Sequence, residues 1–177
     1  LGHFTQNNAR VPRAPGNLRF RPISSELIDV DGDGYIDLVA DGYEPDGLSN
    51  AVYWGSSSGA YLYSNRSVLA PVPDMGVTLD FATEDIDGDG LRDLIVLRTG
   101  STNIYIGRYI QILRQTSARV FADQTAARIS FDRNLHTFDY VRAQDFNGDG
   151  FVDLFIDDKN DMASGQYAWT NNGQGIF

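Results

Sequence analysis

The chain has 177 residues, with 14 Lys and Arg against 24 Asp and Glu, which gives a formal net charge of −10. This acidic balance, without any basic cluster, argues against nucleic-acid binding and against attraction to an anionic membrane. The sequence holds no cysteine, so it has neither a disulfide framework nor a thiolate zinc site. No apolar run approaches the ~20 residues of a membrane-spanning helix, so we expect no membrane insertion.

Three similar units are expected along the chain. Residues 1–16 are rich in Asn, Pro and Arg, and we interpret them as the end strand of a preceding blade followed by a connector. The units then occupy approximately residues 17–70, 76–126 and 133–177, so that residues 1–177 form a single repeat domain. Apolar residues alternate or run in short blocks of Val, Ile, Tyr and Phe, which predicts strands.

Each unit is expected to hold four short strands. The predicted strands cover residues 17–30, 35–41, 51–54 and 60–68 in the first unit, 77–83, 93–98, 104–115 and 119–123 in the second, and 135–144, 153–157, 166–170 and the approach to Phe177 in the third. Residues 125–128 favour one short helical turn. Four strands in a unit of nearly sixty residues are typical of a propeller blade. The predicted fold is therefore all-β and propeller-type, with three four-stranded blades that form a partial or half propeller.

One ten-residue phrase occurs in every unit, at residues 29–38, 85–94 and 145–154. It places oxygen-bearing side chains at positions 1, 3, 5 and 9 and a glycine at position 6. Such crowded carboxylates repel one another unless a cation lies among them, and Ca²⁺ accepts six to eight oxygen ligands. The candidate ligands are the side chains of Asp29, Asp31, Asp33, Asp37, Asp85, Asp87, Asp89, Asp93, Asp145, Asn147, Asp149 and Asp153, with the position-7 carbonyls of Tyr35, Leu91 and Phe151.

These phrases differ from the EF-hand loop, which ends in a bidentate Glu at position 12. Position 12 is Ala40, Val96 or Ile156 here, and an apolar strand follows the acid at position 9. We therefore predict three Ca²⁺ sites at turns between strands, with Gly34 supplying a positive φ and Gly32 leaving the centre uncrowded. An acidic hairpin turn without metal is the alternative. Because Asn147 replaces one carboxylate, the third site is expected to be the weakest.

An aromatic marker repeats with the same step as the calcium phrases. It falls at Phe4, Tyr61, Phe121 and Phe177. The D-x-[DN]-G-D-G-x-x-D-L phrase and the N-G-x-G-x-F ending resemble FG-GAP repeats, the blade type of integrin α-subunit propellers, and the related VCBS repeats of bacterial extracellular proteins. The resemblance covers nearly all of residues 17–177, although the endings at Tyr61 and Phe121 lack the full glycine spacing.

The resemblance implies a β-propeller with Ca²⁺ in the loop between the first two strands of each blade. It also implies an extracellular protein, secreted or at the cell surface, that serves adhesion or ligand binding or supports a catalytic domain. Three blades do not close a ring. The chain is therefore interpreted as a fragment of a longer propeller, an open array, or half of a six-bladed homodimer.

Function is expected to be calcium-binding recognition or adhesion of a protein or glycan ligand, without catalysis. The alternatives are a carbohydrate-binding lectin and the propeller part of an extracellular polysaccharide-active enzyme. Gly55–Gly59 matches a G-x-S-x-G pattern around Ser57, but it lies between strands rather than before a helix. Tyr53 and Trp169 hold equivalent places in their units and could stack on sugars, although packing between blades is the favoured interpretation.

Overall fold

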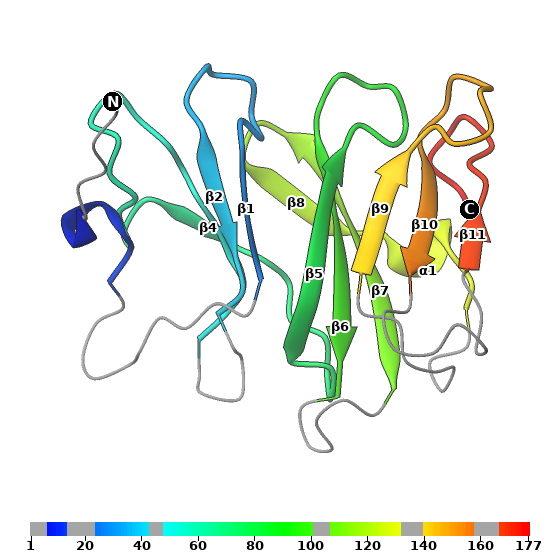
Figure 1. The fold of residues 1–177 in the computed structure, drawn as a ribbon, viewed down its shortest axis with the longest axis horizontal. Helices are drawn as coiled ribbons and strands as arrows, with labels where there is room; N and C mark the ends of the chain where they lie inside the picture. The colour runs from blue at the N-terminus through cyan, green and yellow to red at the C-terminus, as the bar shows by residue number, and fades with distance from the viewer. Residues whose placement is uncertain (1–6, 14–23, 43–47, 101–106, 132–139, 158–166) are drawn as a thin grey trace, which may run out of the picture.

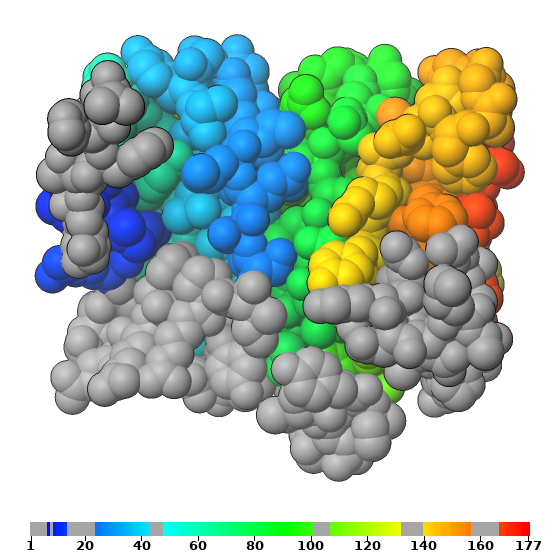
Figure 2. Space-filling model, viewed as in Figure 1, coloured from blue at the N-terminus to red at the C-terminus, as the bar shows by residue number. Residues whose placement is uncertain are grey.

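The computed structural model describes residues 7–13, 24–42, 48–100, 107–131, 140–157 and 167–177. Three antiparallel sheets stand side by side in chain order, and each is one blade (Figure 1). In the space-filling view the blades form adjacent columns, and their upper ends are separate projections (Figure 2). The all-β, propeller-like prediction is therefore confirmed.

Blade 1 has the strand order β1-β2-β3-β4, and blade 2 repeats it as β5-β6-β7-β8. The strands of blade 1 are β1 (Ser25–Ile28), β2 (Asp37–Ala40), β3 (Ala51–Tyr53) and β4 (Arg66–Val68). Those of blade 2 are β5 (Val77–Glu84), β6 (Asp93–Thr99), β7 (Arg108–Ser117) and β8 (Val120–Asp123). Strand β4 is only the end of the predicted segment 60–68. Residues 62–65 form a tight turn there, in which Asn65 N–H donates to the Leu62 carbonyl.

Blade 3 differs from the prediction of four strands. Its described strands are β9 (Tyr140–Gln144), β10 (Asp153–Asp157) and β11 (Tyr167–Trp169), in the order β11-β10-β9. Phe177, where a fourth strand was expected, instead donates its N–H to the carbonyl of Arg128 at 2.7 Å. That carbonyl belongs to the short helix α1 (Thr125–Arg128), which was expected at those residues.

The end strand of a preceding blade was predicted around Phe4, and residues 1–6 lie outside the described residues. Residues 7–13, within the predicted connector, are described and contain a 3-10 turn, η1 (Asn8–Arg10). Among the helices of the described part, none is long and apolar enough to cross a bilayer.

Strand register confirms that the three units are equivalent. Each second strand pairs a leucine with the residue eight places before the aromatic marker. These pairs are Leu38 with Tyr53, Leu94 with Leu113, and Leu154 with Trp169. The calcium phrases therefore fall at matching places, on the first connection of each blade.

Apolar side chains on facing sheets form the core between neighbouring blades. Between blades 1 and 2, Trp54 is only 3% exposed and stacks on Phe121, with ring centroids 6.5 Å apart. Tyr53 is also buried, on the other face of blade 1. Tyr53 therefore packs as the favoured interpretation predicts, whereas the equivalent Trp169 is partly exposed. Each fully buried large apolar side chain contributes roughly 1.5–3 kcal/mol to stability.

The first strands of the blades also contact one another through polar side chains. Thr83 on β5 hydrogen-bonds Glu26 on β1. On the other side of β5, the Asp80 carboxylate accepts the backbone N–H of Val141 on β9 at 3.1 Å and pairs with Arg142 at 3.2 Å. These contacts align β1, β5 and β9, and so place the three calcium phrases at the same end of the array.

Candidate metal centre

Three loops join the first and second strands of the blades: loop 1 (residues 29–37), loop 2 (85–93) and loop 3 (145–153). All three lie at the upper end of the array in Figure 1. Each loop contains the four predicted ligand side chains of its unit. The loops are turns between strands, as predicted, and no helix leaves them.

The first aspartate of each loop organises the backbone around itself. Asp29 Oδ1 accepts N–H groups of Gly32 at 2.8 Å and Asp33 at 3.2 Å, while its Oδ2 accepts Gly34 N–H at 2.9 Å. Asp85 repeats these three bonds in loop 2. In loop 3, Asp145 accepts the N–H groups at positions 4 and 6. The loop amides therefore satisfy the carboxylate at position 1 of each loop.

The glycines at positions 4 and 6 permit this winding. Gly34 has φ +87° and Gly32 has φ +74°. The positive φ expected at Gly34 is confirmed. A Cβ at Gly32 would meet no protein atom within 4 Å. Glycine is favoured at position 4 because side chains seldom adopt this backbone conformation.

In loops 1 and 3, positions 3 and 5 each use one carboxylate or amide oxygen to close a local turn. Asp31 Oδ1 accepts the N–H of Asp33 at 3.2 Å, and Asp33 Oδ1 accepts the N–H of Tyr35 at 2.9 Å. The equivalent bonds recur in loop 3 from Asn147 Oδ1 and Asp149 Oδ1. The second oxygen of each carboxylate therefore remains outside the loop's own backbone bonding.

The aspartate at position 9 is buried in all three loops, with 0% exposure. Asp37 Oδ2 accepts the N–H of Val30 at 2.9 Å, and its Oδ1 accepts the N–H of Gly55 at 2.7 Å. Asp93 and Asp153 accept the corresponding N–H groups of Gln115 and Asn171, both at 2.8 Å. Position 9 thus ties each loop to the end of the third strand of its blade.

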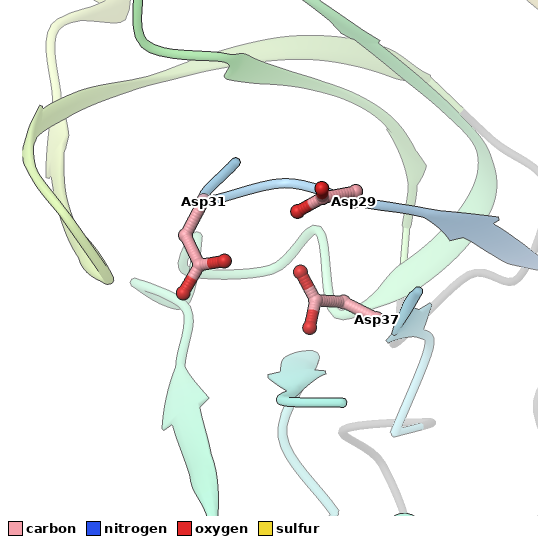
Figure 3. A group of neighbouring side chains, drawn as sticks. All are labelled: Asp29, Asp31 and Asp37. Carbon is pink, nitrogen blue, oxygen red and sulfur yellow. The ribbon is translucent and has the colours of Figure 1, made fainter. Parts of the chain in front are cut away.

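The side chains converge as a cation site requires. One oxygen from each of Asp29, Asp31 and Asp37 lies within 4.8 Å of the others, and their carboxylates point toward one another (Figure 3). Loop 2 brings Asp85, Asp87 and Asp89 together within the same distance. Loop 3 substitutes an amide, and Asn147 Nδ2 donates to Asp149 Oδ2 at 2.9 Å.

Two buried carboxylate oxygens in these loops have no hydrogen-bond partner: Asp87 Oδ1 and Asp153 Oδ2. An unpaired buried carboxylate oxygen is costly, and a cation that it can ligate removes the cost. The donor set consists of hard oxygens, which Ca²⁺ prefers. The loops therefore fit calcium by both their chemistry and their unfilled bonding capacity.

The pKa values of three loop aspartates are shifted by burial and by hydrogen bonding. Burial raises the pKa of Asp93 to about 6, with the charges of Asp87 and Asp89 adding to the effect. Burial likewise raises the pKa of Asp37. At the exposed Asp145, the hydrogen bond from Gly150 N–H, followed by that from Gly148, lowers the pKa. The carboxyls of Asp37 and Asp93 thus resist ionisation, whereas the loop amides favour the ionised form of Asp145.

Sequence reasoning missed two residues, each of which braces a loop from the next blade. Gln115 Nε2 donates to the Val30 carbonyl of loop 1 at 3.1 Å. Asn171 Nδ2 donates to the Ile86 carbonyl of loop 2 at 2.7 Å. Both residues stand six places before an aromatic marker, so aligning the units on that marker would have indicated them.

Three arginines were also missed. Arg119 pairs with Asp31 and Asp33 of loop 1, Arg114 pairs with Asp87 and Asp89 of loop 2, and Arg128 pairs with Asp87. For Asp87, burial acts against ionisation, but hydrogen bonding to Arg114 and the charges of both arginines leave its pKa lowered. Arg119 lies 88 residues from Asp31, so no local sequence signal could have found this pair.

Ser57 lies in an exposed turn between β3 and β4, not at a strand-to-helix elbow. Its neighbours Ser56 and Ser58 hydrogen-bond each other at 2.8 Å. The G-x-S-x-G pattern is a turn, as expected. His3 and His136 lie outside the described residues.

Side-by-side antiparallel sheets, each with an Asp-rich loop on its first connection, define a propeller-type repeat protein. Residues 85–156 match the family model described as FG-GAP-like repeat. The chain therefore carries an FG-GAP-like repeat from loop 2 to β10, which confirms the resemblance. No curated protein sequence matches the chain.

Proposed function

We propose that the chain is a calcium-binding module of an extracellular recognition or adhesion protein, in which Ca²⁺ has a structural role. The residues that would hold the ions are the position 1, 3, 5 and 9 side chains of the three loops, with the carbonyls of Tyr35, Leu91 and Phe151. The observation that carries the proposal is the pair of unsatisfied buried oxygens on Asp87 and Asp153, inside loops of repeated geometry. A divalent cation would supply the positive charge that these loops need.

Calcium at this place would stabilise the fold because of what the loops connect. Each loop joins two strands, and position 9 reaches the third strand. Ligands converge only when these strands are paired, so the free energy of ion binding adds to the free energy of folding. For one ion at a hundredfold excess over its Kd, this amounts to about 2.7 kcal/mol.

An extracellular location and a protein or glycan ligand belong to the same proposal. FG-GAP-like repeats are typical of extracellular proteins, and millimolar calcium there fills sites of modest affinity. A lectin role is the weaker candidate, because Tyr53 and Trp54 are buried and Trp169 is only partly exposed. We assign the chain no catalytic role of its own.

Thermal unfolding in calcium and in a chelator tests the structural role. We expect the chelator to lower Tm by several degrees, calcium to restore it, and magnesium to restore it less. Asp89→Asn, in loop 2, should reduce the calcium-dependent gain, whereas Asp74→Asn should not. Asp74 is a matched control because it carries the same charge in an exposed turn away from the loops. A Tm that is the same with and without calcium would contradict the proposal.

A further inference from the structure

One backbone position has a left-handed conformation in all three units. It lies two places before the aromatic marker, with φ of +62° at Gly59, +67° at Arg119 and +68° at Gly175. Glycine adopts this conformation freely, but for another residue it is strained. An arginine at such a position indicates that its side chain is needed there.

The surroundings hold Arg119 in this strained conformation. Its backbone N–H donates to Gln115 Oε1 at 2.9 Å, and its carbonyl accepts the Ser67 hydroxyl at 2.8 Å. Gln115 is the same residue that braces loop 1 through the Val30 carbonyl. The backbone of Arg119 is therefore fixed relative to loop 1 by Ser67 of blade 1 and Gln115 of blade 2.

The guanidinium of Arg119 lies across two predicted calcium ligands. Its Nε donates to Asp31 Oδ2 at 2.5 Å and its Nη2 to Asp33 Oδ2 at 2.9 Å. The Oδ1 atoms of both aspartates already accept loop N–H groups. Arg119 thus takes the two oxygens that the loop leaves free for a cation.

Loop 2 receives the same contact from a different part of the sequence. Arg114 Nε donates to Asp87 Oδ2 and its Nη2 to Asp89 Oδ2, both at 2.5 Å. Arg128 adds a bond to Asp87 Oδ2 at 2.9 Å. Its guanidinium passes over Gly175, where a Cβ would lie 2.2 Å from Nη1. Arg119 and Arg114 stand at different places in the repeat, yet each brings a guanidinium to positions 3 and 5 of a loop.

Loop 3 has a different arrangement. The oxygen that arginine takes in the other loops, Oδ2 at position 5, accepts the Asn147 amide instead. Within the described part of the chain, no arginine pairs with Asp145, Asp149 or Asp153. Counting side chains, loop 1 has four carboxylates and one arginine, loop 2 four and two, and loop 3 three and none, which gives −3, −2 and −3.

We infer that Arg119 and Arg114 are built-in counter-cations, which hold loops 1 and 2 in the calcium-free protein and release the Oδ2 atoms when calcium binds. This inference rests on the proposed function. Calcium binding in loops 1 and 2 is then an exchange of cations, whereas loop 3 binds without one. Loop 3 should therefore not be the weakest site, contrary to the order that carboxylate number alone predicts.

Trp54 offers a reporter that is specific for loop 1. The Cζ of Arg119 lies 4.8 Å from the centroid of the Trp54 ring. Release of the guanidinium should change the fluorescence of this indole, because a nearby cation interacts with the ring. The chain has two tryptophans, so Trp169→Phe leaves Trp54 as the sole emitter.

Calcium titrations of the full chain in the Trp169→Phe background test the inference. We expect the fluorescence of Trp54 to change on calcium addition, and Arg119→Gln to tighten calcium binding at loop 1 by about three- to tenfold. Arg119→Lys keeps the charge but loses the bidentate contact, so its calcium affinity should lie between those of the parent and Arg119→Gln. Arg142→Gln is the matched control, because Arg142 is an exposed arginine that pairs with Asp80 outside the loops. It should bind calcium as the parent does.

The outcomes separate this inference from the proposed function. Calcium binding that is unchanged or weakened by Arg119→Gln would overturn the exchange while leaving the calcium sites intact. A weakened site would mean that Arg119 positions the ligands instead. Absence of calcium binding in every variant, measured by calorimetry, would overturn both. Arg114→Gln provides a second test at loop 2, where calorimetry should show the same tightening.

Discussion

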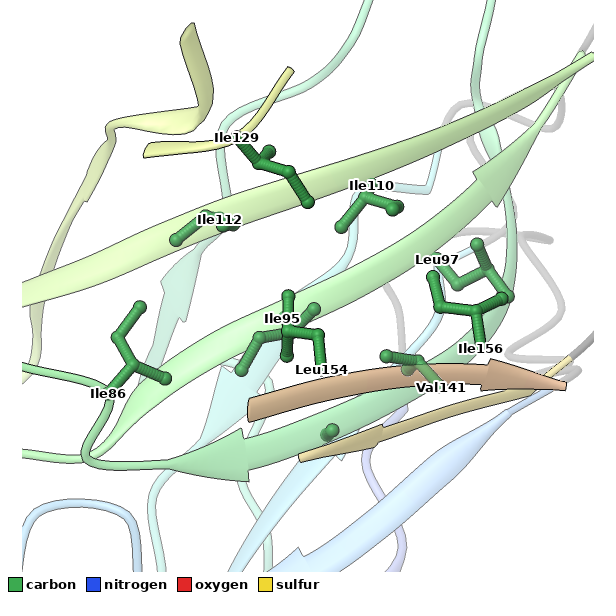
Figure 4. Close-up of a cluster of buried hydrophobic side chains, with 10 residues drawn as sticks. Ile86, Ile95, Leu97, Ile110, Ile112, Ile129, Val141, Leu154 and Ile156 are labelled. Atoms are coloured by element: carbon green, nitrogen blue, oxygen red, sulfur yellow. The ribbon is translucent and has the colours of Figure 1, made fainter. Parts of the chain in front are cut away.

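Blades 2 and 3 share one strand plan, but their surroundings differ. In blade 2 every residue of β6 is buried. One side of it packs on blade 1, while Ile95 and Leu97 on the other side pack against Leu154 and Ile156 of blade 3 (Figure 4). In blade 3 the row equivalent to the second side consists of Arg142, Phe155 and Ala168, and it is largely exposed.

The two rows differ in composition as well as in exposure. The covered row of blade 2 pairs Ala82 with Ile95 and Ile95 with Ile112, all apolar and buried. The exposed row of blade 3 carries an arginine at the place of Ala82, next to a shallow pocket of about 220 Å³ that Phe155 also lines.

The loops follow the same division. Loop 2 is contacted by Asn171 and by Arg128, which pairs with Asp87. The Nη1 of Arg128 also donates to the Gln174 carbonyl of blade 3. Loop 3, on the last described blade, uses its own Asn147 amide. A neighbouring blade therefore contributes to the core and to the contacts of the preceding loop, as Arg119 does at loop 1 and Asn171 at loop 2.

The largest effect should come from the apolar rows. Leu97→Ala removes a fully buried side chain between blades 2 and 3 and should lower the free energy of unfolding by about 2–5 kcal/mol. Phe155→Ala acts on the partly exposed row and should cost only about 1 kcal/mol. Urea unfolding in chelator measures both. Equal losses would mean that the outer row of blade 3 is covered in solution, and would break the comparison.

A smaller effect should appear in the pH dependence of the unfolding free energy, through Asp93 of blade 2. Because the pKa of Asp93 is raised to about 6, the folded protein keeps its proton where the unfolded chain has lost it. The resulting stabilisation is complete below about pH 4 and is lost as pH rises through about 6. In chelator, Asp93 should therefore lower the unfolding free energy by at most about 1.4 kcal/mol per pH unit across that window.

The difference in slope between the parent and Asp93→Asn isolates this group from the other carboxylates. Between pH 4 and pH 6 in chelator, we expect the unfolding free energy to fall less steeply for the variant than for the parent. In calcium, the unfolding free energy of the parent should instead rise with pH, since the ion binds the deprotonated carboxylate. Identical slopes in the two proteins would show that Asp93 ionises normally in the folded, calcium-free state.

Much of the fold could be predicted because its determinants are local. The alternation of apolar residues located β2, β3 and β6, and the ligand spacing with its glycines placed all three loops. The short helix at residues 125–128 was also predicted. Strand ends were less accurate: β4 begins at Arg66 because residues 62–65 form a turn that the pattern did not distinguish from a strand.

The rest of the site depends on contacts between blades. Arg119 approaches Asp31 only after blades 1 and 2 have packed, and a basic residue in a turn carries no sign of its partner. Gln115 and Asn171 share an offset from the aromatic marker, which could have been used. The shared positive φ at Gly59, Arg119 and Gly175 could not, because an arginine does not suggest a left-handed backbone.

The most direct test of calcium in the loops is an anomalous difference map from crystals of this chain grown in millimolar calcium. The account predicts a peak in each of the three loops, within bonding distance of the aspartates at positions 1, 3 and 5, or of Asn147 at position 3 of loop 3. Loops that keep the same winding but show no peak would contradict it.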